Sequence, residues 1–284
     1  MYEKTPDIAG WRDYAISQLK HVSDAPRLDA ERMLGAALAK PRTWLLAHDD
    51  HPLKDAEYEQ LSDWLSARKD HVPLAYLLGS HEFWSLELSV TRDTLIPRPE
   101  TECLVEHALA LISATQQPRI ADLGTGTGAI AIALAHERPN ATVVATDFSE
   151  AALAIAKDNA NRHGLTQIDF RHGHWCSPLA NERFDLIVSN PPYVESNYPG
   201  LGDELKHEPM QALISGEDGL DDIRLLASQV ASHLRPYGHI LIEHGHMQAA
   251  AVSGILRAQS LNVVATHRDL SGLPRFTEAT LKTT

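Results

Sequence analysis

A glycine-rich segment, residues 122–128 (DLGTGTG), stands between a predicted strand and a predicted helix. Gly124, Gly126 and Gly128 allow a tight turn and a close approach of the backbone to a ligand, and the following helix presents free N–H groups at its N-terminus. Asp147 ends the next predicted strand, 23 residues after Gly124. A carboxylate there can accept hydrogen bonds from both ribose hydroxyls of an adenosine. The pattern predicts an adenosine cofactor without choosing between NAD and S-adenosylmethionine; the alternative is a tight turn whose glycines only relieve steric crowding.

A second candidate segment is the tetrapeptide NPPY, which directly follows an apolar predicted strand, FDLIVS. Pro191 and Pro192 fix φ and remove two backbone donors. Hydrogen-bond acceptors therefore prevail there, namely the side-chain oxygen of Asn190 and the backbone carbonyls. Such acceptors suit a planar NH₂ group, either an amide or an exocyclic amine, and Tyr193 offers a flat face for stacking. The alternatives are a simple turn that ends the strand, or a helix-capping role for Asn190.

Both segments belong to the part of the chain in which strands and helices alternate. The predicted strands are residues 119–123, 141–146, 167–171, 184–189, 239–243, 262–267 and 275–282. The predicted helices between them are residues 128–137, 149–163, 220–234 and 247–259. This alternation implies a doubly wound, mainly parallel sheet, in which ligands bind beyond the carboxyl ends of the strands near the topological switch point.

The chain changes character near residue 80. Before it, apolar residues recur at helical spacing, as in Ile8, Trp11, Ala15 and Leu19, which predicts a helical N-terminal domain. After it, an alternating segment predicts strands or a hairpin, and the prolines of LIPRPETE require extended backbone before a helix restarts near Thr101. The expected organisation is a helical domain (residues 1–80), a hairpin and linker (81–100) and an α/β domain (101–284).

Composition narrows the class of protein. The 284 residues are 43% hydrophobic and 22% charged, which excludes wholesale disorder. There is no run of 18 apolar residues, and residues 1–14 are charged without an apolar h-region, so neither a membrane span nor a secretory signal is expected. Two cysteines, Cys103 and Cys176, cannot form a disulfide scaffold, and the expected compartment is the cytoplasm. The net charge of −13 makes a poor binder of phosphates and favours a basic protein partner over DNA or RNA.

No metal site is expected from the sequence. Two His-x-His pairs, His172/His174 and His244/His246, have neither an accompanying cysteine nor a second histidine at helical spacing. Cys176 has no His–Asp arrangement that marks it as a nucleophile, so it is expected to be a small packing residue.

The long polar segment at residues 194–218 contains three glycines. Loops of this length are usually functional, so it is interpreted as a substrate-binding lid, with a surface excursion as the alternative.

The glycine segment, Asp147 and NPPY together resemble a class I S-adenosylmethionine-dependent methyltransferase that acts on a planar nitrogen. Further segments resemble the HemK/PrmC family of protein-(glutamine-N5) methyltransferases over essentially the whole chain. They are PLAYLLGSHEFWSLELSV (73–90), LIPRPETE (95–102), NPPYVE (190–195), HEPMQALISGEDGL (207–220) and LIEHGHMQ (241–248). The resemblance implies a Rossmann-like, seven-stranded, mostly parallel sheet with a small helical N-terminal domain. It also implies methylation of the GGQ glutamine of class I peptide release factors.

The resemblance assigns roles to individual positions. Gly124, Thr125, Gly126, Thr127 and Gly128 would line the methionine end of the cofactor, while Asp147 would hold the ribose. Trp175 falls where the family places a residue beside the adenine, and the preceding residue is His174 where the family usually has Asp. Asn190 would contact cofactor and substrate, and Pro191, Pro192 and Tyr193 would complete the glutamine pocket. The substrate partner implied is a class I release factor, gripped by the N-terminal domain.

Amide nitrogen is a weak nucleophile, so the expected mechanism relies on positioning. Acceptors on Asn190 and Pro191 would take hydrogen bonds from both N–H groups and push electron density onto the nitrogen, in a site that excludes water. The main alternative is a DNA or RNA adenine-N6 methyltransferase, which shares NPPY but requires a basic target-recognition surface. A non-catalytic cofactor-binding protein and an NAD oxidoreductase are further alternatives, and neither accounts for NPPY.

Overall fold

A computed structural model describes residues 6–112 and 117–281 of the chain. The chain forms two compact units. The first comprises residues 1–79 together with 202–207, and the second comprises residues 80–201 together with 208–284. None of the helices in the described residues has the length and apolar character needed to cross a membrane. Residues 1–5, on which the expectation of no secretory signal partly rests, lie outside the described residues.

The first unit is helical, as its apolar spacing predicts. Its helices are α1 (Ile8–Leu19), α2 (Pro26–Leu38), α3 (Arg42–Ala47), α4 (Asp55–Lys69) and α5 (Leu74–Leu78). The Asp7 side chain caps α1 by accepting from the Gly10 N–H, and Pro26 opens α2 at a position where its missing N–H costs nothing. Trp11, Met33 and Leu61 are among the fully buried side chains of a core that is separate from those of the second unit.

Residues 202–207 pack with this helical unit, although they lie far away in the sequence. The buried Arg68 of α4 donates to Asp29 at 2.9 Å and to Glu204 at 2.6 Å. Two carboxylates thus compensate a guanidinium that is only 4% exposed, which is the condition under which a buried charge is tolerated. The middle of the long segment after NPPY therefore belongs structurally to the N-terminal unit.

The second unit begins with a hairpin, β1 (Ser80–Phe83) and β2 (Leu86–Ser89). Asn159 attaches this hairpin to the rest of the unit, because its side chain accepts from the Ser89 N–H at 2.7 Å and donates to the Ser89 carbonyl at 3.0 Å. The same amide also donates to the carbonyl of Thr127 in the glycine-rich segment.

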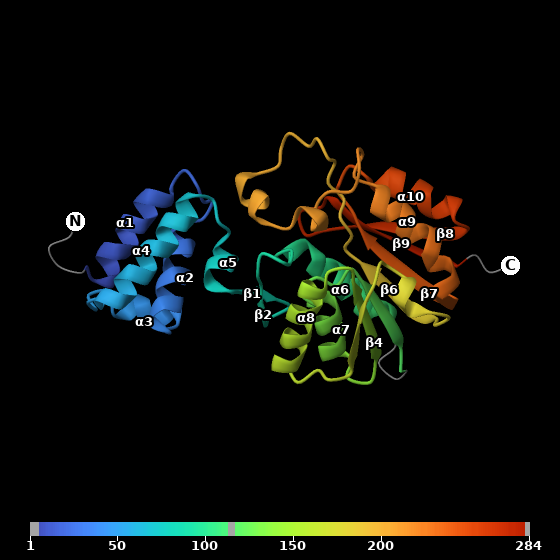
Figure 1. Ribbon diagram of the computed structural model, residues 1–284, viewed down its shortest axis with the longest axis horizontal. Coiled ribbons are helices and arrows are strands. Elements are labelled where there is room, and N and C mark those ends of the chain that lie inside the picture. Colours follow the sequence, from blue (N-terminus) through green and yellow to red (C-terminus); the bar gives the residue numbers. More distant parts are fainter. Residues whose placement is uncertain (1–5, 113–116, 282–284) are drawn as a thin grey trace. The chain divides into compact units, whose positions relative to one another are not determined.

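The large sheet has seven strands in the order β5-β4-β3-β6-β7-β9-β8. They are β3 (Arg119–Leu123), β4 (Thr142–Asp147), β5 (Ile168–His172), β6 (Phe184–Ser189), β7 (Leu234–Glu243), β8 (Leu261–Arg268) and β9 (Pro274–Leu281). Figure 1 labels β4, β6, β7, β8 and β9 of this sheet. Strands β3 to β7 are parallel, and β9 is antiparallel to both β7 and β8. The predicted seven-stranded, mostly parallel sheet is confirmed. Lys282, the last residue of the predicted final strand, lies outside the described residues.

Five long helices accompany the sheet. They are α6 (Pro99–Leu111), α7 (Ala129–Glu137), α8 (Glu150–Arg162), α9 (Asp221–Val230) and α10 (Ala249–Ala258). The predicted helix 220–234 was too long: α9 ends at Val230, and β7 already begins at Leu234. Pro236 has no backbone N–H and disfavours helical conformation in the residue before it, so the chain leaves the helix and enters a strand that is longer than predicted.

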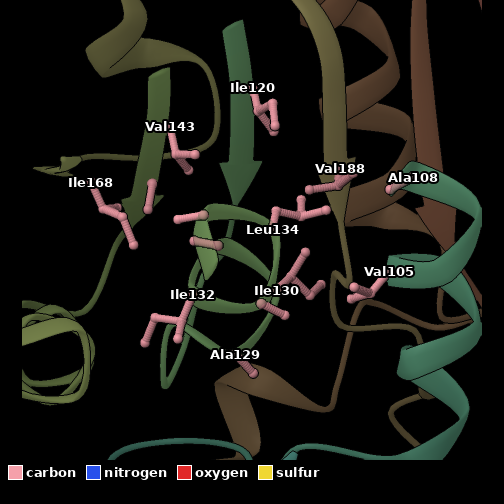
Figure 2. Packing of buried hydrophobic residues seen from close by; sticks show 14 of the residues in the cluster. Val105, Ala108, Ile120, Ala129, Ile130, Ile132, Leu134, Val143, Ile168 and Val188 are labelled. Atoms are coloured by element: carbon pink, nitrogen blue, oxygen red, sulfur yellow. The ribbon is translucent and has the colours of Figure 1, made fainter. Parts of the chain in front are cut away.

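Helix α7 lies in the middle of one apolar layer (Figure 2). Its residues Ala129–Ala135 are all buried, among side chains such as Ile120, Val143 and Val188 of the sheet. The opposite face of the sheet forms a second cluster with α9 and α10. Burial on both faces explains why these strands are continuous apolar runs rather than alternating ones.

Candidate active site

The glycine-rich segment and NPPY meet at the topological switch point of the sheet. They follow β3 and β6, which are neighbours in the sheet although their helices connect them to strands on opposite sides. The buried Ser189 hydroxyl donates to the Leu123 carbonyl at 2.7 Å, so the two strand ends are tied together. This is the position at which open α/β sheets bind their ligands.

The glycine-rich segment turns so tightly that two of its glycines are obligatory. Gly124 has φ +74° and a side chain there would approach the Trp175 ring within 2.9 Å. Gly128 caps α7 with φ +84°, and a Cβ would meet Ile132 at 2.9 Å and Ala156 at 3.2 Å. Gly124 therefore permits close packing of the loop on Trp175, whereas Gly128 permits close packing of α7 on α8.

Asp147 holds the loop from the neighbouring strand. Its carboxylate accepts from the Gly126 N–H and from the Ser149 N–H, each at 2.8 Å. Burial raises the pKa of Asp147, and the backbone donors act in the opposite direction. Each carboxylate oxygen keeps lone pairs beyond these bonds, so the group is placed at the end of β4 with spare acceptor capacity for hydroxyl groups.

The first residue of the glycine-rich segment, Asp122, has a structural role that sequence reasoning missed. Its Oδ2 accepts from the Thr125 hydroxyl at 2.6 Å and from the Ala131 N–H at 3.1 Å, which couples β3, the loop and α7. Its Oδ1 is buried and has no partner within the described part of the chain. Burial raises the pKa of Asp122 to about 7. In the sequence, the position of Asp122 at the start of DLGTGTG could have indicated this role.

A cavity of about 270 Å³ lies at this edge of the sheet. Of the residues predicted to bind a cofactor or act on a substrate, it is lined by Gly124, Thr125, Gly126, Thr127, Asp147, Trp175, Asn190 and Pro192. The lining does not include Gly128, Pro191 or Tyr193. Gly128 is placed instead at the packed start of α7, and Pro191 is buried.

The cavity fits an adenosine cofactor on two counts. The Trp175 Nε1–H is buried without a partner among the described residues, so an indole donor stands ready beside the glycine loop. His174 and Phe148 also line the cavity, and their rings lie edge to face with centroids 5.6 Å apart. Aromatic side chains and the Asp147 carboxylate in one cavity suit a flat base joined to a ribose.

The side chain of Asn190 is held by a series of hydrogen bonds that involves three separate segments. Its Nδ2 donates to the Thr101 hydroxyl oxygen at 3.3 Å, and that hydroxyl donates to Glu243 Oε2 at 2.7 Å. The Tyr193 hydroxyl lies 3.4 Å from Glu243 Oε1. Thr101 is in the first turn of α6, and Glu243 ends β7 and is completely buried. Neither residue was predicted as part of the site.

This series of hydrogen bonds determines the orientation of the Asn190 side-chain amide. A threonine hydroxyl has one proton, and the short contact with Glu243 engages it. Thr101 can therefore only accept from Asn190, which places Nδ2 against Thr101 and leaves Oδ1 on the other side. In the part of the chain that is described, Asn190 Oδ1 has no hydrogen-bond donor. The arrangement presents a free amide oxygen to the cavity that Asn190 lines.

Burial raises the pKa values of both Glu243 and Tyr193. Burial raises the pKa of Glu243 to about 7, against the opposing effect of the Thr101 hydroxyl. Burial and the neighbouring Glu243 raise the pKa of the Tyr193 phenol far above its usual range. Tyr193 thus remains neutral, and Gln248 fixes its backbone by donating to the Tyr193 carbonyl at 3.0 Å.

Two residues of the LIPRPETE segment have structural partners, and Cys176 packs in the core. Arg98 pairs with the buried Glu208, which also accepts from the Ile96 N–H at 3.0 Å, so the proline-rich linker is fixed to the segment after NPPY. Glu102 accepts from the Trp84 N–H in the hairpin turn. Cys176 is buried in the apolar core, and burial raises its thiol pKa to about 12, as suits a packing residue.

Comparison with known proteins places the chain in a family. Residues 10–79 match the model of the PrmC N-terminal domain, and residues 100–216 match that of the methyltransferase small domain. The release factor glutamine methyltransferase of Xylella fastidiosa (strain Temecula1) is 50% identical over 252 residues, which are 88% of this chain and 92% of that protein. The Escherichia coli (strain K12) release factor glutamine methyltransferase is 42% identical over 94% of this chain and 96% of its own.

Solved structures agree on the fold. The 16S rRNA N2 G1207 methyltransferase of T. thermophilus, solved in complex with AdoMet and guanosine, has a TM-score of 0.51 at 18% identity, covering 72% of this chain and 50% of its own. The fold and the site define a class I methyltransferase. More narrowly, the chain belongs to the release factor glutamine methyltransferase family.

Proposed function

We propose that this enzyme methylates the side-chain amide nitrogen of the glutamine in the GGQ motif of class I peptide release factors, with S-adenosyl-L-methionine as methyl donor. The single observation that carries the proposal is the fixed orientation of Asn190, whose Oδ1 is left free beside the cavity by the Thr101–Glu243 chain. Family membership supplies the substrate, and AdoMet in the related ribosomal RNA methyltransferase supports the cofactor.

Different residues of the cavity would bind different parts of the cofactor. Asp147 would accept from the ribose hydroxyls, Trp175 would pack beside the adenine, and residues 124–127 would border the methionine end. When bound, S-adenosylmethionine supplies a methyl group activated by attachment to a positively charged sulfur. The chain itself needs no strong base, because its task is to orient a weakly nucleophilic nitrogen.

Asn190 and Pro191 carry the substrate side of the mechanism. A primary amide has two N–H groups, and Asn190 Oδ1 together with the Pro191 carbonyl would accept both. These bonds raise the electron density on the nitrogen, which keeps one of its two protons and releases the other to solvent when it is methylated. A carbonyl and an amide oxygen fixed in advance do not reorganise during the reaction, which is the main source of enzymatic electrostatic stabilisation. Tyr193, neutral and anchored to Glu243, supports the pocket from behind.

Glu243 acts as a positioning residue in this mechanism. Ionised Glu243 accepts a hydrogen bond from the Thr101 hydroxyl and so keeps Asn190 Oδ1 free. Protonated Glu243 can instead donate to Thr101, whose own proton then turns to Asn190 and favours the flipped amide. The flipped amide presents N–H groups to the substrate N–H groups and cannot bind them. The mechanism therefore requires the ionised form of Glu243.

We also propose that the helical N-terminal unit grips the release factor. Support comes from residues 202–207, which follow NPPY in the sequence and yet pack with the helical unit through Arg68 and Glu204. A segment that connects the catalytic tetrapeptide with the helical unit is suited to sense a bound protein. Because release factors act on ribosomes, the proposed compartment is the cytoplasm, and DNA or RNA alone is not expected to be a substrate.

The decisive experiment uses labelled S-adenosylmethionine with three substrates. These are a class I release factor, its GGQ→GGA variant, and a mixture of DNA and RNA. Label on the wild-type release factor and none on the GGA variant is the expected result. Label on nucleic acid alone would overturn the proposal in favour of base methylation, and label on the GGA variant would move the reaction to another residue.

A further inference from the structure

Three imidazoles converge on one buried carboxylate among α6, β7, β8 and β9, and none of these four residues lines the cavity. His107 Nε2 and His267 Nε2 lie 2.9 Å and 3.0 Å from the same oxygen, Glu278 Oε2. His239 Nδ1 lies 2.8 Å from the other oxygen, Oε1. Glu278 is 5% exposed at its side chain, whereas the three histidines are each about a quarter exposed. The cluster has a buried centre and an open rim.

The electrostatics of the cluster leave negative charge at its centre. Within the described residues, no lysine or arginine forms an ion pair with Glu278. Burial raises the pKa of Glu278, but the three imidazole hydrogen bonds outweigh it and hold that pKa below its usual range. Burial also lowers the pKa of His267. At neutral pH the centre is thus an ionised carboxylate.

A second charged imidazole would be opposed by its neighbour. The rings of His107 and His267 have centroids 3.9 Å apart and face the same oxygen. Like charges so close disfavour joint protonation. A divalent cation would be attracted to the carboxylate, and an ionised carboxylate with neutral imidazoles is the protonation state in which these groups ligate metals.

The three proposed ligands stand on one helix and two paired strands. His107 is on α6, His267 on β8 and Glu278 on β9, and β8 and β9 are paired by main-chain hydrogen bonds on either side of these residues. The candidate ligand atoms all lie within 4.8 Å of one another. Tetrahedral Zn²⁺ with ligands at about 2.1 Å separates them by roughly 3.4 Å, so small side-chain rotations suffice. His239 would remain on the second oxygen and orient the carboxylate.

We propose that His107, His267 and Glu278 form a binding site for Zn²⁺ or a chemically similar divalent transition metal, with His239 as the orienting partner of Glu278. Two imidazoles and one carboxylate, with a further position left for water, is a donor set typical of zinc. The site joins α6 to β8 and β9. Because α6 also carries Thr101, a bound metal would stabilise the helix that positions Asn190 without belonging to the cavity.

The test is a zinc titration of tag-free, chelator-treated enzyme against a chromophoric chelator. We expect one equivalent to bind. His107→Asn and His267→Asn should each weaken binding by at least about 100-fold, and His239→Asn by roughly 10–100-fold, the usual loss for an orienting partner. The matched control is His136→Asn, because His136 is an exposed histidine of α7, and it should leave the affinity unchanged. Zinc at about 100 times its Kd should raise the Tm of the wild type by roughly 5–10 °C.

Two results would overturn the proposal. One is a wild-type chain that binds no more zinc than His267→Asn, and the other is an equal loss in His136→Asn. X-ray absorption of the zinc-loaded wild type keeps the test valid if the variants fail to fold. Two imidazole nitrogens and oxygen in the coordination shell support the site, and a shell without imidazole contradicts it.

Discussion

The two sides of the cavity are built in opposite ways. On the side where we propose that the cofactor binds (the cofactor side), residues 122–128 supply a continuous stretch whose backbone N–H groups bond to Thr146 and Asp147. On the side where we propose that the substrate binds (the substrate side), Asn190, Thr101 and Glu243 come from three distant segments and are connected only through side chains. The geometry of the cofactor side depends on the backbone conformation of the loop. The geometry of the substrate side depends on which atom of each hydrogen bond donates and which accepts.

This difference predicts different consequences of mutation. The conformation of the glycine-rich loop is disturbed by an added side chain or by a residue that disfavours positive φ. Variants of this loop should therefore lose cofactor affinity. The hydrogen bonds between the side chains are disturbed by a change of protonation or by an isosteric substitution. Variants of these residues should therefore lose turnover, while their affinity for the cofactor stays nearly constant. Four substitutions test the comparison, from the largest expected effect to the smallest.

Asn190→Ala should have the largest effect. It removes a preorganised acceptor from the substrate amide, and loss of one such contact lowers kcat by roughly 10²–10³-fold. Methyl transfer to a release factor measures it, with Asn140→Ala as the control at an exposed asparagine. Near-native turnover in Asn190→Ala would contradict the proposed mechanism.

Glu243→Gln should lower kcat by roughly 10–100-fold, which corresponds to the loss of one charge-assisted hydrogen bond. The new NH₂ can donate to Thr101 and so favour the flipped Asn190 amide, while the Kd for S-adenosylmethionine stays close to that of the wild type. Glu82→Gln, at an exposed glutamate of β1, is the matched control. A variant that lost cofactor affinity and turnover equally would indicate general disruption of the fold instead.

The pH dependence separates the role of Glu243 in catalysis from its effect on stability. Its pKa is raised from 4.5 to about 7 in the folded chain, so kcat should rise as pH increases through about 7. The contribution of Glu243 to the free energy of unfolding changes with pH in the opposite direction. A pKa that is raised in the folded chain means that the folded chain binds the proton more tightly than the unfolded chain. This contribution is therefore complete below about pH 4.5 and is lost as the pH rises through about 7. Asp122 contributes with the same sign. In Glu243→Gln the acid limb of kcat should disappear, and a retained limb would assign it to another group.

Gly124→Ala tests the cofactor side. An alanine must accept φ +74° and approach Trp175 within 2.9 Å, and left-handed strain alone costs about 1–2 kcal/mol. We expect the Kd for S-adenosylmethionine to rise by roughly 5–30-fold, measured by calorimetry. Gly254→Ala is the matched control, because a Cβ there has nothing within 4 Å and the residue lies inside α10. Equal affinities for the two variants would show that the loop tolerates added volume.

Cys176→Ala should have the smallest effect on activity. The thiol is buried, and its pKa of about 12 makes it unreactive at neutral pH. We expect kcat to change less than about twofold and the free energy of unfolding to fall by roughly 1 kcal/mol from lost packing. A large loss of turnover with unchanged stability would indicate a chemical role for the thiol.

Most of the fold and the cofactor side could be predicted because their signals are local. Alternating apolar runs and helical stretches predicted seven strands, and DLGTGTG with Asp147 predicted the loop and its partner. The end of α9 and the start of β7 were misplaced, since apolar spacing near residue 234 does not show that Pro236 ends the helical conformation. NPPY marked the substrate side, but Thr101 and Glu243 gave no signal of their own.

The sequence by itself determined the element order, the glycine loop and the chemical character of NPPY, because each depends on neighbours within a few residues. Only the tertiary structure decided that α6 brings Thr101 between Asn190 and Glu243, and that four elements bring three histidines around Glu278. The physical reason is that a hydrogen bond or a coordination shell depends on distances of about 3 Å. Residues separated by up to 171 positions, such as His107 and Glu278, reach such distances only after sheet and helix have packed.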